Sequence, residues 1–260
     1  MPDKIKVVVV GARGKMGETV CRAVLSDGDL ELVGAVDTKD IGTIVPMSDG
    51  VVISPSLKEL LAAGAAEVVV DFTRADAILG NAAIAAAAGA HLVIGATGLL
   101  SDEIDKLKEV AAQHGANILL APNFALGAVI MMKISQKIAG YFDRAEIIEL
   151  HHDQKHDAPS GTAILTAEMV AENLRPEPLD EVEKRPGARG AKVNEIPIHS
   201  VRLPGLVAHQ EVIFGLLGQT LTIRHDSIDR SSFMPGVVMA IKRIKSQPGF
   251  TYGLDKLLDL

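Results

Sequence analysis

Short apolar runs alternate with helical segments along the first half of the chain. Residues 4–10 form a β-branched run that ends at a glycine, as expected for a strand buried on both faces. Further strands are predicted at residues 30–36, 51–53, 68–70, 92–94 and 118–120, and helices at residues 18–25, 57–63, 75–88 and 102–113. This alternation is typical of a Rossmann-type, doubly wound parallel sheet.

The pattern changes after residue 125. Helices are predicted at residues 126–139, 162–174 and 233–245, strands at 144–150, 196–202, 209–214 and 220–225, and a long surface loop at 175–195, with a tail at 250–260. Consecutive strands with short turns favour a mixed, mostly antiparallel sheet. We therefore expect a second domain of α+β type after residue 125.

Three serines are predicted to cap helices. Ser56 and Ser101 precede helical runs that carry acidic residues in the first turn, and Ser160 precedes the helix predicted from residue 162. A serine hydroxyl at such a position accepts a hydrogen bond from a backbone N–H of the first turn.

Composition narrows the class of protein. The 260 residues are 48% hydrophobic and only 3% aromatic, so the core must be aliphatic. A net charge of -7, from 26 basic and 33 acidic residues, argues against a nucleic-acid partner. The single cysteine, Cys21, excludes an internal disulfide and is expected to be a buried apolar residue.

No apolar run approaches the roughly 20 residues that a membrane-spanning helix requires. The sequence therefore predicts a cytoplasmic protein without membrane contact.

The first candidate site is a glycine-rich turn between the first strand and the first helix. Gly11, Gly14 and Gly17 follow a G-x-x-G-x-x-G spacing, in which glycines allow a tight turn, approach to a pyrophosphate and close helix packing. Asp37 lies twenty residues after Gly17, at the end of the second strand, where a carboxylate can bind the adenosine ribose. This context favours dinucleotide binding over a purely structural turn.

Three later turns follow predicted strands and should line the same crevice, at residues 71–74, 95–98 and 121–124. The cofactor can be NADH or NADPH. Asp37 favours a free 2′-hydroxyl, whereas Arg13 or Lys39 could neutralise a 2′-phosphate, and the sequence leaves the choice open.

The second candidate site is the segment Glu149-Leu-His-His-Asp-Gln-Lys-His-Asp-Ala-Pro-Ser-Gly-Thr162. It gathers three imidazoles, an ammonium and a helix start, which suits an acid–base site that binds an anion. A solvated polar strand end is the plain alternative.

Other functions fit these residues less well. His151, His152 and His156 could bind zinc, but neighbours on an extended segment point in opposite directions and Lys155 would repel a cation, so no metal is expected. An aldehyde dehydrogenase would need a nucleophilic cysteine near the ligand cleft, and Cys21 lies in the first helix instead. Another NAD(P)-dependent dehydrogenase, or a nucleotide sensor without turnover, stays open as an alternative.

Taken together, these motifs resemble bacterial dihydrodipicolinate reductases over nearly the whole chain. The resemblance is carried by residues 11–17, 71–73, 95–98, 121–124, 149–162, 209–215 and 230–233, and the histidine-rich segment is its most specific part. It implies NADPH- or NADH-dependent reduction of the cyclic dicarboxylate 4-hydroxy-tetrahydrodipicolinate to tetrahydrodipicolinate, in the diaminopimelate route to lysine. It also implies that residues 1–125 plus 234–260 form a dinucleotide-binding domain, and that residues 126–233 form a domain for substrate binding and oligomerisation, with a homotetramer built through the second sheet. Some relatives carry a basic residue directly after the acid at position 37, and this chain has Thr38 there.

The resemblance also implies site residues. His151 and Lys155 match the proposed proton donors, and His152, Gly161, Thr162 and Thr97 match substrate-binding positions. The implied cofactor positions are Gly11, Ala12, Arg13, Gly14, Lys15, Met16, Gly17, Asp37, Lys39, Phe72, Gly95, Ala96, Thr97, Ala121, Pro122, Asn123 and Phe124.

Overall fold

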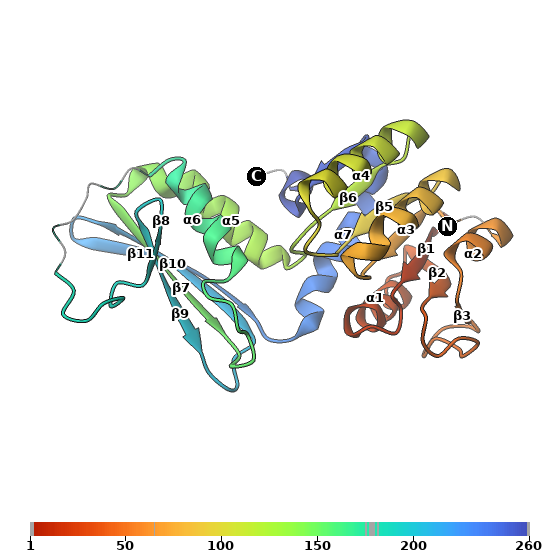
Figure 1. Cartoon of the computed structure of the whole chain (residues 1–260), viewed down its shortest axis with the longest axis horizontal. Helices are drawn as coiled ribbons and strands as arrows, with labels where there is room; N and C mark the ends of the chain where they lie inside the picture. Colours follow the sequence, from red (N-terminus) through yellow and green to blue (C-terminus); the bar gives the residue numbers. More distant parts are fainter. Residues whose placement is uncertain (1–2, 65, 175, 177–179, 181, 259–260) are drawn as a thin grey trace. The chain divides into compact units, whose positions relative to one another are not determined.

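The computed structural model describes residues 3–64, 66–174, 176, 180 and 182–258. The chain forms two compact units (Figure 1). The first combines Met1–Phe124 with Phe233–Asp259, and the second is Ala125–Ser232.

The first unit is built on a seven-stranded sheet in the order β12-β6-β5-β4-β1-β2-β3, and every neighbouring pair is parallel. Its central strands consist of buried valine, leucine and isoleucine, because helices cover both faces. The strands are β1 (Ile5–Val10), β2 (Leu30–Val36), β3 (Ile53–Ser54), β4 (Val68–Asp71), β5 (His91–Ile94), β6 (Ile118–Leu120) and β12 (Phe250–Tyr252).

One face of this sheet packs against three consecutive helices that share a single core with it, and α1 packs beside α7 (Figure 1). The helices are α1 (Lys15–Ser26), α2 (Leu57–Ala63), α3 (Ala75–Ala87), α4 (Ser101–His114) and α7 (Met234–Arg243), with short 3-10 turns at Ile244–Ser246 and Leu254–Leu257. The prediction of a doubly wound parallel sheet is confirmed.

Three details of the first unit differ from the prediction. Helix α1 begins at Lys15, three residues earlier than expected, because Gly14 already serves as its N-cap residue. Strand β3 is Ile53–Ser54 rather than residues 51–53, and the tail contains a seventh strand, β12, that pairs with β6.

The expected helix caps are only partly confirmed. The Ser56 hydroxyl accepts a hydrogen bond from the Glu59 N–H at 3.2 Å, as predicted. The Ser101 prediction is wrong, because Ser101 is the first helical residue and Leu100 precedes it as the cap residue. The Glu103 carboxylate accepts a hydrogen bond from the Leu100 N–H at 2.7 Å, so a glutamate side chain and not a serine hydroxyl binds a backbone N–H at this helix start.

The second unit contains a five-stranded sheet in the order β11-β10-β7-β9-β8. Only the β7–β9 pair is parallel, so the predicted mixed, mostly antiparallel sheet is confirmed. The strands are β7 (Arg144–His151), β8 (Ala191–Val193), β9 (Ile196–Arg202), β10 (Ala208–Leu216) and β11 (Gln219–Ser227).

Two helices cover one face of this second sheet (Figure 1). Helix α5 (Leu126–Ile138) and helix α6 (Gly161–Ala171) share a core with the inward residues of β7, β9 and β10. Short 3-10 turns lie at Ala139–Tyr141 and Arg230–Phe233.

The predicted loop at 175–195 is partly wrong. Its end forms strand β8, which pairs with β9 through a turn where Asn194 and Glu195 have positive φ. Residues 175, 177–179 and 181 of that segment lie outside the described part of the chain. The helix predicted from residue 162 begins at Gly161 and ends at Ala171.

Candidate active site

The glycine-rich turn has the geometry that a bound phosphate requires. Gly11 has φ +79°, which favours glycine, and a Cβ on Gly17 would lie 1.9 Å from the Gly11 carbonyl oxygen. Since α1 begins at Lys15, the N–H groups of its first residues have no carbonyl partner within the helix. Free N–H groups at a helix start form an anion site, so this turn fits a dinucleotide pyrophosphate.

Asp37 connects this turn to the end of β2. One carboxylate oxygen accepts the Arg13 N–H at 2.8 Å, and the other accepts the Lys39 N–H at 3.0 Å. Each oxygen can accept a further hydrogen bond, so Asp37 can still bind ribose hydroxyls. The Lys39 residue is exposed.

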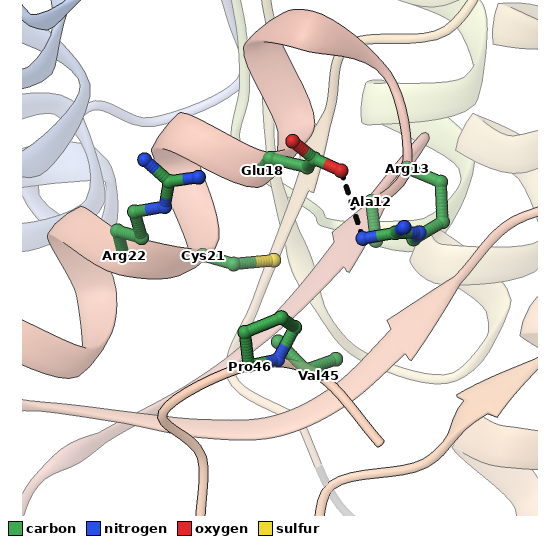
Figure 2. Close-up of a pocket in the computed structure, with 7 residues that line it drawn as sticks. All are labelled: Ala12, Arg13, Glu18, Cys21, Arg22, Val45 and Pro46. Atoms are coloured by element: carbon green, nitrogen blue, oxygen red, sulfur yellow. Dashed lines mark ion pairs between the residues drawn. The ribbon is translucent and has the colours of Figure 1, made fainter. Parts of the chain in front are cut away.

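The Arg13 side chain is already paired with two acids. Its guanidinium lies 2.8 Å from Glu18 and 2.7 Å from Asp40, and the hydrogen bond that it donates to Asp40 raises the pKa of Arg13. Figure 2 shows the Arg13–Glu18 pair beside a small pocket into which the Cys21 sulfur points. Burial raises the pKa of Cys21 to about 12, so its thiol stays neutral. The pocket is lined by Ala12, Arg13, Glu18, Cys21, Arg22, Val45 and Pro46.

The turns after β4, β5 and β6 lie against one another. A Cβ on Gly95 would lie 2.1 Å from the Phe72 ring, and the Phe72 and Phe124 ring centroids are 5.7 Å apart. Phe124 is 2% exposed and is therefore a core residue. Of the remaining predicted positions in these turns, Ala96 and Ala121 are buried, Asn123 is half-buried, and Thr97 and Pro122 are exposed.

Asp71 is a buried residue of this region to which sequence reasoning gave no role. It ends β4 with no exposed surface, and it accepts hydrogen bonds from the Thr73 N–H at 2.8 Å, the Thr73 hydroxyl at 2.6 Å and the Asn81 amide at 2.8 Å. A Cβ on Gly11 would lie 3.2 Å from the Thr73 methyl group. Asp71 therefore braces the turn that packs against the glycine-rich loop.

The histidine-rich segment begins at the end of β7. His151 is the last strand residue, with 16% of its side chain exposed, and its Nδ1 lies 2.5 Å from Oε2 of Glu149. His152 and His156 are exposed. Within the described ranges, no group of three or more His, Cys, Asp or Glu residues is arranged to hold a metal.

Lys155 is held by a neighbouring acid. Its Nζ lies 2.8 Å and 2.6 Å from the two oxygens of Asp157, and this hydrogen-bonded pair lowers the pKa of Asp157. The Lys155 N–H also donates to the His152 carbonyl at 3.1 Å, which turns the chain. The Lys155 side chain is 21% exposed, and its ammonium can bind a second anion.

Ser160 caps the helix that follows, as predicted. Its hydroxyl accepts from the Ala163 N–H at 3.2 Å, and α6 begins at Gly161. The first N–H groups of α6, at Gly161 and Thr162, have no carbonyl partner within the helix and can bind a carboxylate.

A buried ion pair joins these parts. Glu149 has no exposed surface and receives both Nη atoms of Arg202, at 2.9 and 2.8 Å, and the Ser160 N–H at 3.2 Å. Burial alone would raise its pKa, but hydrogen bonds from His151, Arg202 and Ser200 outweigh it and lower the pKa of Glu149 to about 2. Sequence reasoning missed Arg202, because it could be linked to Glu149 only by knowing that β7 pairs with β9.

Two models of one protein family together match nearly the whole chain. The chain matches the models of the N-terminal part of dihydrodipicolinate reductase over residues 5–124 and of its C-terminal part over residues 127–258. No helix among the described residues is long and apolar enough to cross a membrane.

Individual relatives agree with these matches. The chain is 49% identical to the 4-hydroxy-tetrahydrodipicolinate reductase of Syntrophomonas wolfei subsp. wolfei, over 99% of this chain and 100% of the relative. It is 47% identical to the enzyme of that name from Moorella thermoacetica, over 98% of each. A solved structure of dipicolinate-bound dihydrodipicolinate reductase from Paenisporosarcina sp. TG-14 is similar with a TM-score of 0.89 and 40% identity, over 98% of this chain and 100% of that one.

Proposed function

The chain belongs to the dihydrodipicolinate reductase family, and on that premise we propose which of its residues carry out the reaction. The activity is the reduction of 4-hydroxy-tetrahydrodipicolinate in lysine biosynthesis, with a nicotinamide cofactor. The observation that best supports the assignment is the buried carboxylate of Glu149, which contacts His151 and also accepts the N–H of Ser160, the cap residue of α6.

The first unit binds the nucleotide. The N–H groups at the start of α1, from Lys15 to Gly17, bind the pyrophosphate, and Asp37 binds a ribose. The turns containing Phe72, residues 95–97 and residues 121–124 border the cofactor. Among these, the buried Ala121 and Phe124 act as support rather than as contacts. When bound, the nicotinamide supplies a hydride to the substrate.

The second unit binds the substrate. The two carboxylates of the substrate are bound by Lys155, by His152 and by the first N–H groups of α6, at Gly161 and Thr162. The ammonium of Lys155 is positively charged, and N–H groups at a helix start carry a partial positive charge. Thr97 of the first unit is a further proposed substrate contact. Because Asp157 already pairs with Lys155, a substrate carboxylate must displace or share that partner.

His151 provides the proton that completes the reduction. An imidazole can donate near neutral pH, and Lys155 is the second donor implied by its match to the family. We expect His151→Ala and Lys155→Ala to lower kcat by roughly 10²–10⁴-fold, the usual range for a lost acid catalyst, with nearly unchanged nucleotide affinity. A steady-state assay with 4-hydroxy-tetrahydrodipicolinate and a nucleotide-binding titration measure both quantities.

His156→Ala is the matched control, because His156 lies in the same loop but is exposed. It should keep the wild-type turnover. If the His151 or Lys155 variants lost nucleotide affinity instead of turnover, their proposed roles would be wrong.

NADH should serve at least as well as NADPH. Glu18 and Asp40 already occupy the Arg13 guanidinium, and Asp37 adds a further negative charge where a 2′-phosphate would lie. Asp40→Asn removes one competitor for Arg13. It should raise kcat/KM for NADPH roughly two- to fivefold, the effect of one exposed ion pair, and leave NADH nearly unchanged.

Asp49→Asn is the control for this change, because Asp49 is exposed and makes no ion pair with Arg13. It should alter neither cofactor's kcat/KM. A wild-type enzyme that already preferred NADPH by more than tenfold would contradict this interpretation of Arg13.

The second unit also supports a homotetramer. Helices α5 and α6 cover only one face of its sheet, and the outer strand β11 is largely exposed, with Leu221 at 41%. We propose that copies of this chain associate through this sheet.

A further inference from the structure

Glu149 and His151 lie on the same side of β7. They are two residues apart, and successive side chains of a strand point to opposite faces, so positions 149 and 151 share one face. The carboxylate is fully buried, whereas the imidazole is partly exposed. Glu149 therefore lies behind His151, on the side away from solvent.

The contact determines which ring nitrogen carries hydrogen. Glu149 has a pKa of about 2, so it is ionised at neutral pH and can only accept hydrogen bonds. The nitrogen that contacts it, Nδ1, must then be the donor. Within the described part of the chain, Nε2 of His151 makes no hydrogen bond, which leaves it for proton exchange.

Arg202 connects this carboxylate to the loop that carries Lys155. Besides its two bonds to Glu149, the guanidinium donates to the Lys155 carbonyl at 3.1 Å and to the Asp157 carbonyl at 2.7 Å. Strands β7 and β9 pair in a register that sets Arg202 beside His151. One guanidinium thus fixes the backbone of the loop and the carboxylate behind the imidazole.

The charged groups joined in this network are Glu149, Arg202, Lys155 and Asp157. On the other side of β7, strand β10 places Ala208 opposite His151 and the neutral Gln210 opposite Glu149. Glu149 is therefore the only acid that contacts the imidazole among the described residues.

We propose that Glu149 is a positioning residue for His151, and that Arg202 keeps Glu149 anionic and in place. Glu149 holds the ring with hydrogen on Nδ1, directs Nε2 to the substrate, and stabilises the ring while it is protonated. The proton then leaves Nε2 for the substrate carbon, the N–H electron pair stays on Nε2, and the neutral ring keeps its hydrogen on Nδ1. The assignment rests on the proposed role of His151 as proton donor.

The kinetic test compares two glutamates of the same strand. Glu149→Gln should lower kcat about 100-fold with little change in KM, and the alkaline limb of its pH–rate profile should move to lower pH, since protonated His151 loses its counter-charge. Glu146→Gln is the matched control. Glu146 also pairs with an arginine and a histidine, Arg189 and His199, but makes no contact with His151, so it should show the wild-type kcat and pH profile.

Glu149→Asp should recover part of kcat, because it restores the charge. A Glu149→Gln enzyme within threefold of wild-type kcat would overturn the proposal. So would a 100-fold loss with an unmoved alkaline limb, which would indicate a purely structural role.

A second measurement leaves Glu149 and Arg202 unaltered, so it does not depend on whether variants of these two residues fold. The ¹⁵N NMR shifts of ring-labelled wild-type protein, with the His151 signal assigned by its loss in His151→Ala, report the tautomer of the neutral ring. Hydrogen on Nδ1 supports the proposal, and hydrogen on Nε2 overturns it. Because this result does not depend on turnover, it still decides the positioning role if the wild-type chain fails to reduce 4-hydroxy-tetrahydrodipicolinate, an outcome that would refute the proposed function alone.

Discussion

The two units each bury one carboxylate at the end of a strand, and the two carboxylates behave in opposite ways. Asp71 ends β4 and Glu149 lies near the end of β7, and neither has any exposed surface. Burial raises the pKa of Asp71, despite its hydrogen bonds from Thr73 and Asn81. The pKa of Glu149 is lowered to about 2, although burial again opposes the charge.

The difference lies in the partners. Among the described residues, Asp71 is bound only by a neutral N–H, hydroxyl and amide, whereas Glu149 also receives the full charge of Arg202. Neutral donors are enough to brace a turn against a glycine-rich loop. Supporting an imidazole that gains and loses a proton requires a carboxylate that stays ionised, and a buried carboxylate needs a cation for that.

Removing the Arg202 guanidinium should change the stability of the protein more than the other substitutions in this comparison. Arg202→Met keeps much of the side-chain volume but leaves Glu149 buried without a fixed positive charge. Breaking one partner of a buried pair costs about 3–5 kcal/mol, so the free energy of unfolding should fall by that order. Urea unfolding, monitored by hydrogen exchange in peptides of the second unit, measures the change in the free energy of unfolding.

Lys242→Met is the control for that substitution. Lys242, in α7 of the first unit, also pairs with two acids, Asp27 and Asp29, but its side chain is 33% exposed. Surface ion pairs contribute little, so the unfolding midpoint should hardly move. Equal losses in both variants would mean that burial of the Glu149–Arg202 pair has no special weight.

Much of this contrast lay beyond sequence reasoning, and the reason is separation along the chain. The glycine-rich turn and the histidine-rich segment are local patterns, so they could be identified from adjacent residues. Arg202 lies 53 positions after Glu149, and only the pairing of β7 with β9 brings them together. Strand β12 was missed for the same reason, because three residues gain strand structure only by pairing with the distant β6.

The wrong prediction for Ser101 has a local cause, because two side chains near the start of α4 can accept a hydrogen bond from its backbone. Ser101 looked like a helix cap, yet Glu103 satisfies the Leu100 N–H and lets the helix include Ser101. Either residue type could have served, and the choice depends on the path of the preceding loop. Fold class was therefore predictable, whereas individual boundaries and the partners of buried charges were not.

Acidification should affect the two carboxylates with opposite sign. The pKa of Asp71 is higher in the folded state than its ordinary value of 3.8, so the folded state takes up a proton first as pH falls. Between the raised pKa and 3.8, Asp71 therefore makes the folded state more stable as pH falls. The folded-state pKa of Glu149 is lowered from 4.5 to about 2, so its contribution is lost as pH falls through that window. Each effect approaches roughly 1.4 kcal/mol per pH unit within its window.

Urea unfolding at several pH values, with Asp71→Asn and Glu149→Gln as references, isolates the two contributions. The advantage of wild type over Asp71→Asn should grow on acidification, and its advantage over Glu149→Gln should shrink. If the stability advantage of wild type over both variants changed in the same direction on acidification, the opposite pKa shifts of Asp71 and Glu149 would be contradicted.

The smallest expected effect concerns one neutral donor of Asp71. Thr73→Val keeps the shape of the side chain but removes the hydroxyl that donates to Asp71 at 2.6 Å, while the Thr73 N–H still donates at 2.8 Å. One hydrogen bond to a buried group contributes about 1 kcal/mol, so the unfolding free energy should fall by about that amount. Thr38→Val, in the exposed turn after β2, removes a hydroxyl with no buried partner and should be neutral. A loss of several kcal/mol at Thr73 would mean that Asp71 depends on its hydroxyl donor as heavily as Glu149 depends on Arg202, and the distinction between neutral and charged partners would fail.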